Sequence, residues 1–406
     1  MRLFTALLAF ICCMNSPAFA DEIVLGTIFE IKDSQAPTAQ EALNGALLAV
    51  KKINESSDQN KIKLEVESVS GETIDVLKGV DNLSRSKGII AATGIISENN
   101  ALTAAPAFQA ANLPFLCSGA QVDSLPHIGT NVFTLAVPDI RTGQLLAEFA
   151  GGSMLVNNIM LIRSDLSDST ARQADSFRRR FKQNGGNIMA EMRITEQDPD
   201  LSFVSRKLKE LTPPENTNST VLDDTVGVSD FVDSAADITI QKRDAEPARP
   251  QVDGIVVFAP ARIASKLLNQ LQQDQQIFPV LGGTSFDSIA MQESMKEYPA
   301  TVFYASQASM DREAPLVRSF VESYKALFGQ TPQTGYAALG FDSIMLLAAA
   351  TQKQPSTSET IRNGLGQIKN FDGVSGKISF QGRSAEKPLY IMQVKGKQKL
   401  MATMLE

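Results

Sequence analysis

The sequence lacks tryptophan and has one histidine, His127, and three cysteines among its 406 residues. Cys12 and Cys13 lie in an N-terminal segment that we expect to be removed, which leaves Cys117 as the one thiol of the mature chain. One histidine and one cysteine are too few to build a zinc site from His and Cys ligands. A single thiol also excludes an internal disulfide, so stability must come from core area, which a chain of this length can bury.

Motifs of common catalytic and nucleotide sites are missing too. There is no G-x-S-x-G elbow, no P-loop and no G-x-G-x-x-G turn. A Ser–His or Cys–His pair would have to use His127, which follows Pro126 in an expected loop, nine residues after Ser118. We interpret His127 as a surface residue, with a catalytic pair as the alternative. The sequence thus predicts no enzyme, no cofactor and no metal.

After residue 20 the sequence has no apolar run long enough to cross a membrane, so we expect no membrane insertion of the mature chain. Residues 1–20 begin with Arg2, continue with an apolar run over 3–14 and end in Ala18-Phe19-Ala20. This pattern is typical of a secretory signal peptide cleaved after Ala20. It predicts a periplasmic protein.

A lipoprotein anchored through Cys12 or Cys13 is the alternative, but Ile11 stands where such an anchor wants a small residue. The formal net charge of the whole chain is −7. A net negative charge favours solubility and argues against nucleic acid or an anionic membrane surface as a partner.

Runs with strand character alternate with amphipathic runs over the whole mature chain. Residues 23–29, 61–69, 88–95 and 113–118 are apolar or alternating, and residues 39–56 carry apolar side chains at helical spacing. Strands that alternate with helices through short connections predict parallel sheets covered by helices on both faces. The same plan restarts near Asp139, so we predict an α/β fold of two doubly wound parallel-sheet lobes.

We assign residues 21–138 and about 307–370 to lobe 1, and residues 139–306 and about 371–406 to lobe 2. Residues 213–250 interrupt lobe 2 with a stretch rich in Asp, Ser, Thr and Pro. Its composition predicts a flexible acidic surface insertion. A hairpin made from VGVSDFV and ITI is the alternative.

The stretch PFLCSGAQVDSL, residues 114–125, ends an apolar run with small and polar residues. Cys117 beside Ser118 invites interpretation as a nucleophile. A free cysteine at the end of an apolar run is more typical of a small buried hydrophobe, with a reactive thiol as the alternative.

Several segments, in order, resemble the type I periplasmic solute-binding proteins of ABC importers, in the branch that binds leucine, isoleucine and valine. The similarity runs from about residue 23 to the C-terminus, apart from the insertion. It is carried by NGALLAVKKIN, ATGIISENNALTAAPAFQAANLPFLCSGA, DIRTG, SFRRRFKQNGG, FVESYKALFGQTPQTGYAALGFDSIMLLAAA and GVSGKISFQGR.

The resemblance implies two lobes joined by three hinge strands, with a ligand trapped between them. Ligands of open α/β sheets bind beyond the carboxyl ends of the strands, which places the site in loops 30–38, 97–100, 118–121, 165–169, 259–262 and 283–287. The stretch around Ser118 is therefore interpreted as binding a ligand, with the backbone N–H groups of Gly119 and Ala120 open to an oxygen. The predicted ligand-binding residues are Ser97, Glu98, Asn99, Ser118, Gly119, Ala120, Gln121, Asp165, Ser169 and Thr284.

The sequence also departs from the family pattern. Glu98 and Gln121 replace an expected Ser and Thr, and the second-lobe acid that holds an ammonium group falls near Thr284. The aromatic residues that the family places in the cleft fall on Thr38, on Ser169 and near Pro260. We therefore expect a small polar solute, such as an amino acid or amide, and a membrane permease as partner. The alternative is a ligand-sensing or protein-binding regulatory module of the cell envelope.

Overall fold

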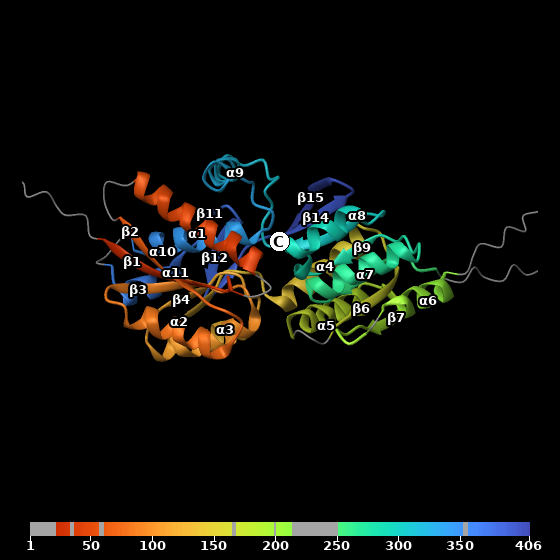
Figure 1. The fold of residues 1–406 in the computed structure, drawn as a ribbon, viewed down its shortest axis with the longest axis horizontal. Helices are drawn as coiled ribbons and strands as arrows, with labels where there is room; N and C mark the ends of the chain where they lie inside the picture. The colour runs from red at the N-terminus through yellow and green to blue at the C-terminus, as the bar shows by residue number, and fades with distance from the viewer. Residues whose placement is uncertain are drawn as a thin grey trace, which may run out of the picture.

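The computed structural model describes residues 22–32, 36–56, 61–164, 168–198, 200–212, 251–351 and 356–406. Two α/β lobes lie side by side in the described chain, each built on its own sheet (Figure 1). The expected signal peptide, residues 1–20, and the expected insertion, residues 213–250, lie outside the described residues.

The first sheet has eight strands in the order β11-β12-β13-β5-β4-β3-β1-β2. Neighbours from β5 to β2 run parallel, as does the β13–β5 pair, whereas β11, β12 and β13 pair with one another in antiparallel fashion. The strands are β1 Ile23–Phe29, β2 Ile62–Ser68, β3 Ile89–Gly94, β4 Phe115–Cys117, β5 Val132–Thr134, β11 Phe371–Gly373, β12 Gly376–Gln381 and β13 Ser384–Glu386.

The second sheet has seven strands in the order β15-β14-β10-β9-β8-β6-β7. Its strands from β10 to β7 are parallel, and β14 and β15 add an antiparallel edge. The prediction of two parallel-dominated sheets is confirmed, and the antiparallel strands are an addition. The strands are β6 Asn158–Arg163, β7 Asn187–Arg193, β8 Gly254–Phe258, β9 Val280–Gly282, β10 Val302–Ser306, β14 Leu389–Lys395 and β15 Gln398–Leu405.

Helices cover both faces of each sheet, and most of them present an apolar stripe to buried strands, whereas the helix of residues 315–328 packs against another helix. Around the first sheet these helices are α1 Ala36–Ser56, α2 Thr73–Arg85, α3 Glu98–Ala110, α9 Pro315–Phe328, α10 Tyr336–Ala350 and α11 Ser358–Gln367. Around the second they are α4 Asp139–Gly152, α5 Asp168–Gln183, α6 Ser202–Leu211, α7 Ala261–Gln273 and α8 Gln292–Glu297.

The chain passes between the two sheets after β5, after β10 and after β13. The third passage lies between Glu386 and Leu389, so the strands of residues 371–386 belong to the first sheet. The expected assignment of residues 371–386 to lobe 2 is therefore wrong. The three strands lie at the sheet edge. β13 pairs with β5, β12 pairs with β13, and β11 pairs with β12, so the pairing of β13 with β5 joins all three to the first lobe.

Candidate functional site

The loops that follow the parallel strands of both sheets meet around a cavity of about 230 Å³. From the first lobe come residues after β3 and β4 and at the starts of α1 and α10. From the second come residues after β6, β8 and β9. The lining residues are Thr38, Ile96, Ser97, Glu98, Gln121, Ser169, Thr170, Pro260, Ala261, Thr284, Ser285, Asp287, Ser288 and Tyr336.

The lining is dominated by groups that form hydrogen bonds. Seven of its residues carry hydroxyl groups as serine or threonine, two carry carboxyl groups and one is an aromatic residue, Tyr336. In the described part of the chain, Oε1 of Gln121 and Oγ of Ser288 are buried without a hydrogen-bond partner. Buried polar atoms are normally paired, so these two are suited to receive a polar guest.

Five of the predicted ligand-binding residues line this cavity: Ser97, Glu98, Gln121, Ser169 and Thr284. They come from four segments of the sequence, at 97–98, 121, 169 and 284, and they lie together because the loops at the carboxyl ends of parallel strands converge. Thr38 and Pro260, where the family pattern expects aromatic residues, also line the cavity. The wall there is correspondingly small and polar.

Four predicted residues lie elsewhere. Ser118 is fully buried, and its N–H and hydroxyl donate to the carbonyl oxygens of Gly94 and Ile95. The N–H of Gly119 donates to Ile95 over 3.1 Å, so the expectation that it is open to a ligand is wrong. Ala120 is buried outside the cavity lining, and Asn99 is exposed on α3. Asp165, the remaining prediction, lies outside the described residues.

No sequence pattern marked Asp287, Ser288 or Tyr336 as a site residue. Asp287 lies in the predicted loop 283–287 after β9 and Ser288 directly follows it, but Thr284 is the one residue of that loop predicted to bind a ligand. Oδ2 of Asp287 accepts from Ser306 Oγ over 2.6 Å and from the N–H of Gly335 over 3.0 Å, and burial raises the pKa of this carboxyl. Tyr336 begins a helix that packs behind the first sheet, and no motif marked it.

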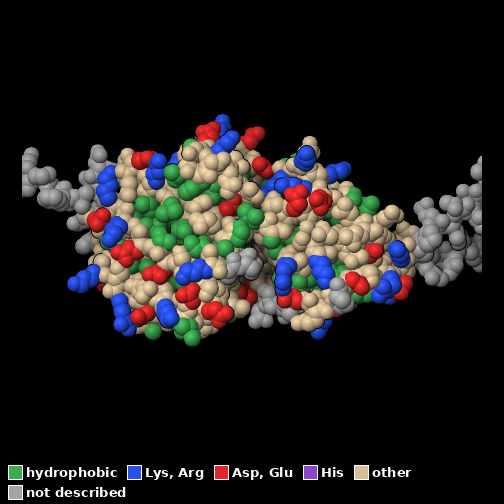
Figure 2. Space-filling view, in the orientation of Figure 1, with side chains coloured by type: hydrophobic (Ala, Val, Ile, Leu, Met, Phe, Trp, Pro, Cys, Tyr) green, Lys and Arg blue, Asp and Glu red, His purple; other side chains and the backbone are tan. Residues whose placement is uncertain are grey.

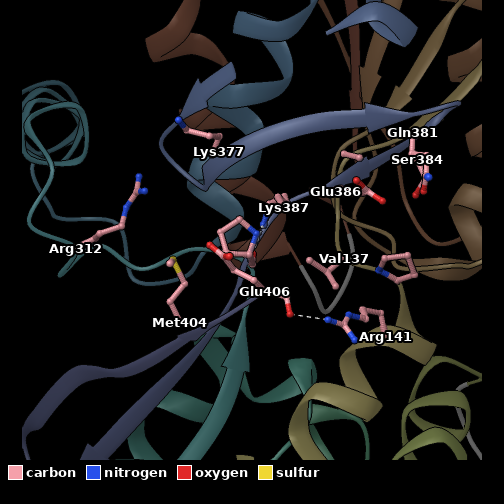
Figure 3. Close-up of a pocket in the computed structure, with 13 residues that line it drawn as sticks. Val137, Arg141, Arg312, Lys377, Gln381, Ser384, Glu386, Lys387, Met404 and Glu406 are labelled. Carbon is pink, nitrogen blue, oxygen red and sulfur yellow. Dashed lines mark hydrogen bonds between the residues drawn. The ribbon is translucent and has the colours of Figure 1, made fainter. Parts of the chain in front are cut away.

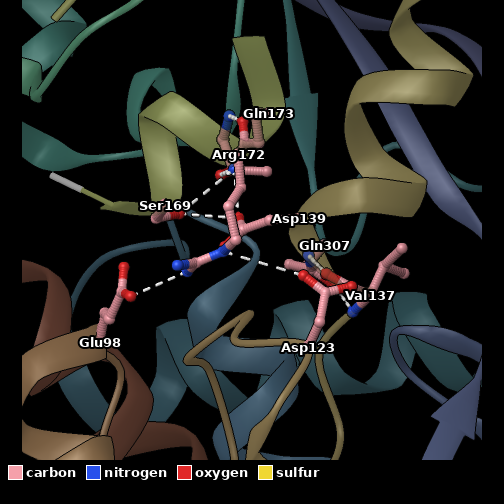
Figure 4. A network of polar contacts seen from close by, with 9 residues as sticks. Glu98, Asp123, Val137, Asp139, Ser169, Arg172, Gln173 and Gln307 are labelled. Atoms are coloured by element: carbon pink, nitrogen blue, oxygen red, sulfur yellow. Dashed lines mark hydrogen bonds and ion pairs between the residues drawn. The ribbon is translucent and has the colours of Figure 1, made fainter. Parts of the chain in front are cut away.

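A charged network beside the cavity joins the two lobes (Figure 4). Arg172 on α5 contacts Oε1 of Glu98, at the start of α3, over 2.9 Å. The same guanidinium donates to Asp139 over 2.8 Å and lies 3.8 Å from Asp123. Arg172 therefore offsets part of the negative charge that Glu98 brings to the cavity, which otherwise would repel a carboxylate there.

Asp139, the first residue of α4, is the centre of this network. It is fully buried, and burial raises the pKa of its carboxyl to about 7 despite hydrogen bonds from Gln173, Ser169 and Arg172. Gln173 also donates to Oγ1 of Thr284 over 2.8 Å, so the network reaches the cavity wall. The position of two lining residues, Ser169 and Thr284, thus depends on the buried carboxyl.

A glycine makes this arrangement possible. A Cβ on Gly143 would lie 2.0 Å from Oγ of Ser176 and 2.3 Å from the carbonyl oxygen of Gln173. Without that side chain α4 and α5 pack closely, which brings Asp139 to Arg172 and Gln173. The spacing of Asp139 and Gly143 in the DIRTG motif therefore has a packing reason.

Ser97 is held by a second buried acid. Glu30 is fully buried and accepts from the backbone N–H of Ile96 and from the N–H and the hydroxyl of Ser97, the hydroxyl over 2.8 Å. Burial raises the pKa of Glu30, and these hydrogen bonds oppose the rise. The hydroxyl of Ser97 is thereby oriented, and its oxygen remains able to accept a bond from a guest.

Cys117 and His127 have the ordinary environments that were expected. Cys117 is fully buried, and burial raises the pKa of its thiol to about 12. A thiol that stays protonated is a poor nucleophile. His127 is exposed at the end of a short 3₁₀ turn, Leu125–His127.

Comparisons with solved structures find the same fold in other proteins. The branched-chain amino acid transporter substrate binding protein LivJ of Streptococcus pneumoniae, solved with isoleucine, is 23% identical with a TM-score of 0.77, over 95% of this chain and 99% of that chain. The leucine binding protein LivK of Thermotoga maritima is 16% identical with a TM-score of 0.75, over 95% of this chain and 99% of that chain.

A solute binding protein of an ABC transporter from Rhodopseudomonas palustris, solved with 3,4-dihydroxybenzoic acid, is 18% identical with a TM-score of 0.73, over 95% of this chain and 97% of that chain. No curated protein sequence matches the chain. The sequence profile of the periplasmic binding proteins matches residues 22–399. The chain belongs to the periplasmic binding protein family.

Proposed function

We propose that the protein captures a small polar solute between its lobes and delivers it to a membrane permease of an ABC importer. One observation carries this proposal: loops from the carboxyl ends of strands in both sheets line one polar cavity. A guest there contacts both lobes at once, so its binding favours the closed arrangement over an open one.

The structural neighbours support this reading. One is named as the substrate binding protein of a branched-chain amino acid transporter and was solved with isoleucine, and another as the solute binding protein of an ABC transporter and was solved with 3,4-dihydroxybenzoic acid. The regulatory module remains a second hypothesis without a described contact in its favour. No helix in the described ranges has the length and apolarity to cross a membrane.

The size and chemistry of the cavity limit which solutes can bind. Its volume of about 230 Å³ is below the roughly 300–1,000 Å³ of sites for drug-sized ligands. Seven serine and threonine hydroxyl groups and one aromatic residue, a tyrosine, suit an amino acid, amide or similar compound rather than a large apolar side chain. We propose binding without chemistry, after export and cleavage behind Ala20.

A ligand screen tests the proposal. The mature chain, residues 21–406, is melted with single amino acids, amides, short carboxylic acids and sugars. A solute at 100 times its Kd should stabilise the protein by about 2.7 kcal/mol. A complete screen with no stabilising solute would count against solute capture.

Ser288→Ala sharpens the test, because its hydroxyl lines the cavity and has no hydrogen-bond partner among the described residues. Losing one hydrogen bond to the solute should weaken binding by about 2- to 12-fold. Ser84→Ala is the matched control, since its buried hydroxyl also has no partner in the described chain but lies on α2 outside the cavity. Equal affinities for both variants would place the solute elsewhere.

A further inference from the structure

The lining of the solute cavity carries acidic side chains but no basic one. Glu98 and Asp287 are its charged residues, and no Lys, Arg or His of the described chain belongs to it. Arg172 contacts Glu98 over 2.9 Å, and Lys399 opposes the rise in the pKa of Asp287, but both cations lie outside the lining. The charged groups that line the cavity are therefore all carboxyl groups.

This one-sided lining is a local feature of the molecule. Figure 2 shows Lys and Arg side chains interspersed with Asp and Glu over both lobes. A larger cavity of about 700 Å³, beside the connections between the lobes, is lined by four basic side chains as well as two glutamates (Figure 3). The four are Arg141, Arg312, Lys377 and Lys387. This cation-lined cavity shares no lining residue with the solute cavity.

The proton donors of the loops after β3 and β4 are already used within the protein. The N–H groups of Ile96 and Ser97 and the hydroxyl of Ser97 all donate to the buried carboxyl of Glu30. The N–H groups of Ser118 and Gly119 donate to carbonyl oxygens at and just after the end of β3. Successive backbone N–H groups in such loops can hold an anion. Here oxygens of the protein occupy these donors, so they are not open to a guest.

Four of the seven serine and threonine hydroxyl groups in the lining also donate within the protein. They belong to Ser97, Ser169, Thr170 and Ser285, and each donates over 2.7–3.2 Å to a carboxyl or carbonyl oxygen. A hydroxyl group has one proton and two lone pairs, so each of these four can only accept from a guest. The hydroxyl groups of Thr38, Thr284 and Ser288 donate to no described residue and can either donate or accept.

The lining also holds buried acceptors without a donor. Oε1 of Gln121 and Oε2 of Glu98 receive no hydrogen bond from any described residue. The two residues lie beside the same pair: the N–H of Asp139 donates to the carbonyl oxygen of Gln121 over 2.9 Å, and Nη2 of Arg172 contacts both Asp139 and Glu98. Buried acceptors are normally paired with a donor. A guest that brings N–H groups to this side of the cavity would supply it.

We propose that the solute is a small amine or carboxamide without a free carboxylate group, and that Glu98 selects it by repelling carboxylates. This inference rests on solute capture and narrows it to one class of compound. Ammonium and carboxamide groups donate through two or three N–H groups, which suits the acceptors of Gln121 and Glu98. A carboxylate can only accept, and it would meet two carboxyl groups and no basic side chain in the lining.

Titration calorimetry of residues 21–406 at pH 7 and constant ionic strength tests the proposal with matched pairs. Propionamide is compared with propionate, glycinamide with glycine, and alaninamide with alanine. Any compound that stabilises the protein in the ligand screen is added with its matched acid or amide. Each pair is nearly equal in size and differs in the carboxylate. The amide should bind at least about tenfold more tightly than the acid, as expected for gaining hydrogen bonds to a charged group.

Glu98→Gln should lower this preference at least about tenfold, because the variant lacks the repelling charge and leaves Nη2 of Arg172 able to donate to a bound acid. Glutamine matches glutamate in size, so the variant should fold. Glu148→Gln is the matched control. Glu148 accepts from Arg180, on the same helix as Arg172, over 2.7 Å, but lies outside the cavity lining. The control should leave the preference unchanged.

Each outcome supports or overturns the proposal. Acids that bind in the solute cavity as tightly as their amides overturn it, as does a preference that Glu98→Gln leaves unchanged or that Glu148→Gln lowers equally. An acid that binds without displacing the amide occupies another site, such as the cation-lined cavity, and agrees with the proposal. If no compound of any class binds, solute capture itself fails and this proposal falls with it. That result differs from a carboxylate bound in the solute cavity, which overturns the selection by Glu98 alone.

Discussion

Arg172 and Glu98 form an ion pair, 2.9 Å between Nη2 and Oε1, that joins a helix of one lobe to a helix of the other. The arginine is 28% exposed and the glutamate 11%, so water screens the contact only in part. Arg172 also holds the buried Asp139 over 2.8 Å. Arg172 therefore contributes both to the contact between the two lobes and to the contact between α4 and α5 within the second lobe.

Replacing Arg172 with glutamine should loosen the lobes and destabilise the fold. Hydrogen bonds to charged groups contribute about 1.5–3 kcal/mol, and the variant loses those to Asp139 and the ion pair with Glu98. Denaturant unfolding measures the stability, and small-angle X-ray scattering measures the radius of gyration, which should rise. Arg178→Gln is the control, on the same helix, with partners at the surface of the second lobe. If both variants behave like the wild type, Arg172 does not hold the two lobes together.

The carboxyl of Asp139 should make stability depend on pH. Its pKa is about 7 in the fold and near 3.8 without it, so the folded protein holds the extra proton between these values. The carboxyl therefore adds up to about 4 kcal/mol to the free energy of unfolding. This contribution is fully present below about pH 4 and is lost as pH rises through 7. The unfolding free energy of the wild type minus that of Asp139→Asn should therefore increase from pH 7 to pH 4. A difference that stays flat would contradict the assignment.

Cys117 should be unreactive in the native protein. Burial and a thiol pKa of about 12 keep it protonated and out of reach of a thiol reagent at pH 8. We expect no reaction with a chromogenic disulfide reagent until guanidinium chloride unfolds the chain, and then one thiol per mature molecule. Rapid labelling of the native protein would show that β4 is more accessible than the structure indicates.

Gly340 on α10 should not tolerate alanine. A Cβ there would lie 1.8 Å from the carbonyl oxygen of Ala42 on α1, so the two helices would have to separate. Overpacking of this kind costs about 1–3 kcal/mol. Gly366→Ala on α11 is the control, since its Cβ would meet only the carbonyl oxygen of Gly382 at 3.5 Å, and alanine should there stabilise by about 0.5–1 kcal/mol. Thermal unfolding of both variants checks the contrast.

Much of the fold could be predicted from the sequence because apolar residues recur with a different period in its strands and in its helices. The apolar alternation of residues 61–69 and the helical spacing of residues 39–56 correspond to β2 and α1. The strands of residues 371–386 were assigned to the wrong lobe, because a three-residue strand such as β13 carries no pattern that names its partner.

Part of the candidate site could also be predicted from the sequence. Ser97, Gln121 and Thr284 follow strands, and strand ends converge. Ser118 also follows a strand, but its polar groups bond to the neighbouring β3 strand and the turn after it, which the sequence does not reveal. Arg172 is one of four arginines on α5, and only the packed structure shows which of them contacts the other lobe.

The pairing of β13 with β5 has a consequence for biosynthesis. Thr134 and Ser384 meet in that pair although 250 residues separate them. Residues 135–383 are therefore translated before β13 can cover this edge of β5. An uncovered strand edge invites association with other chains, so we expect the nascent chain to be prone to association until residues 384–386 have been synthesised.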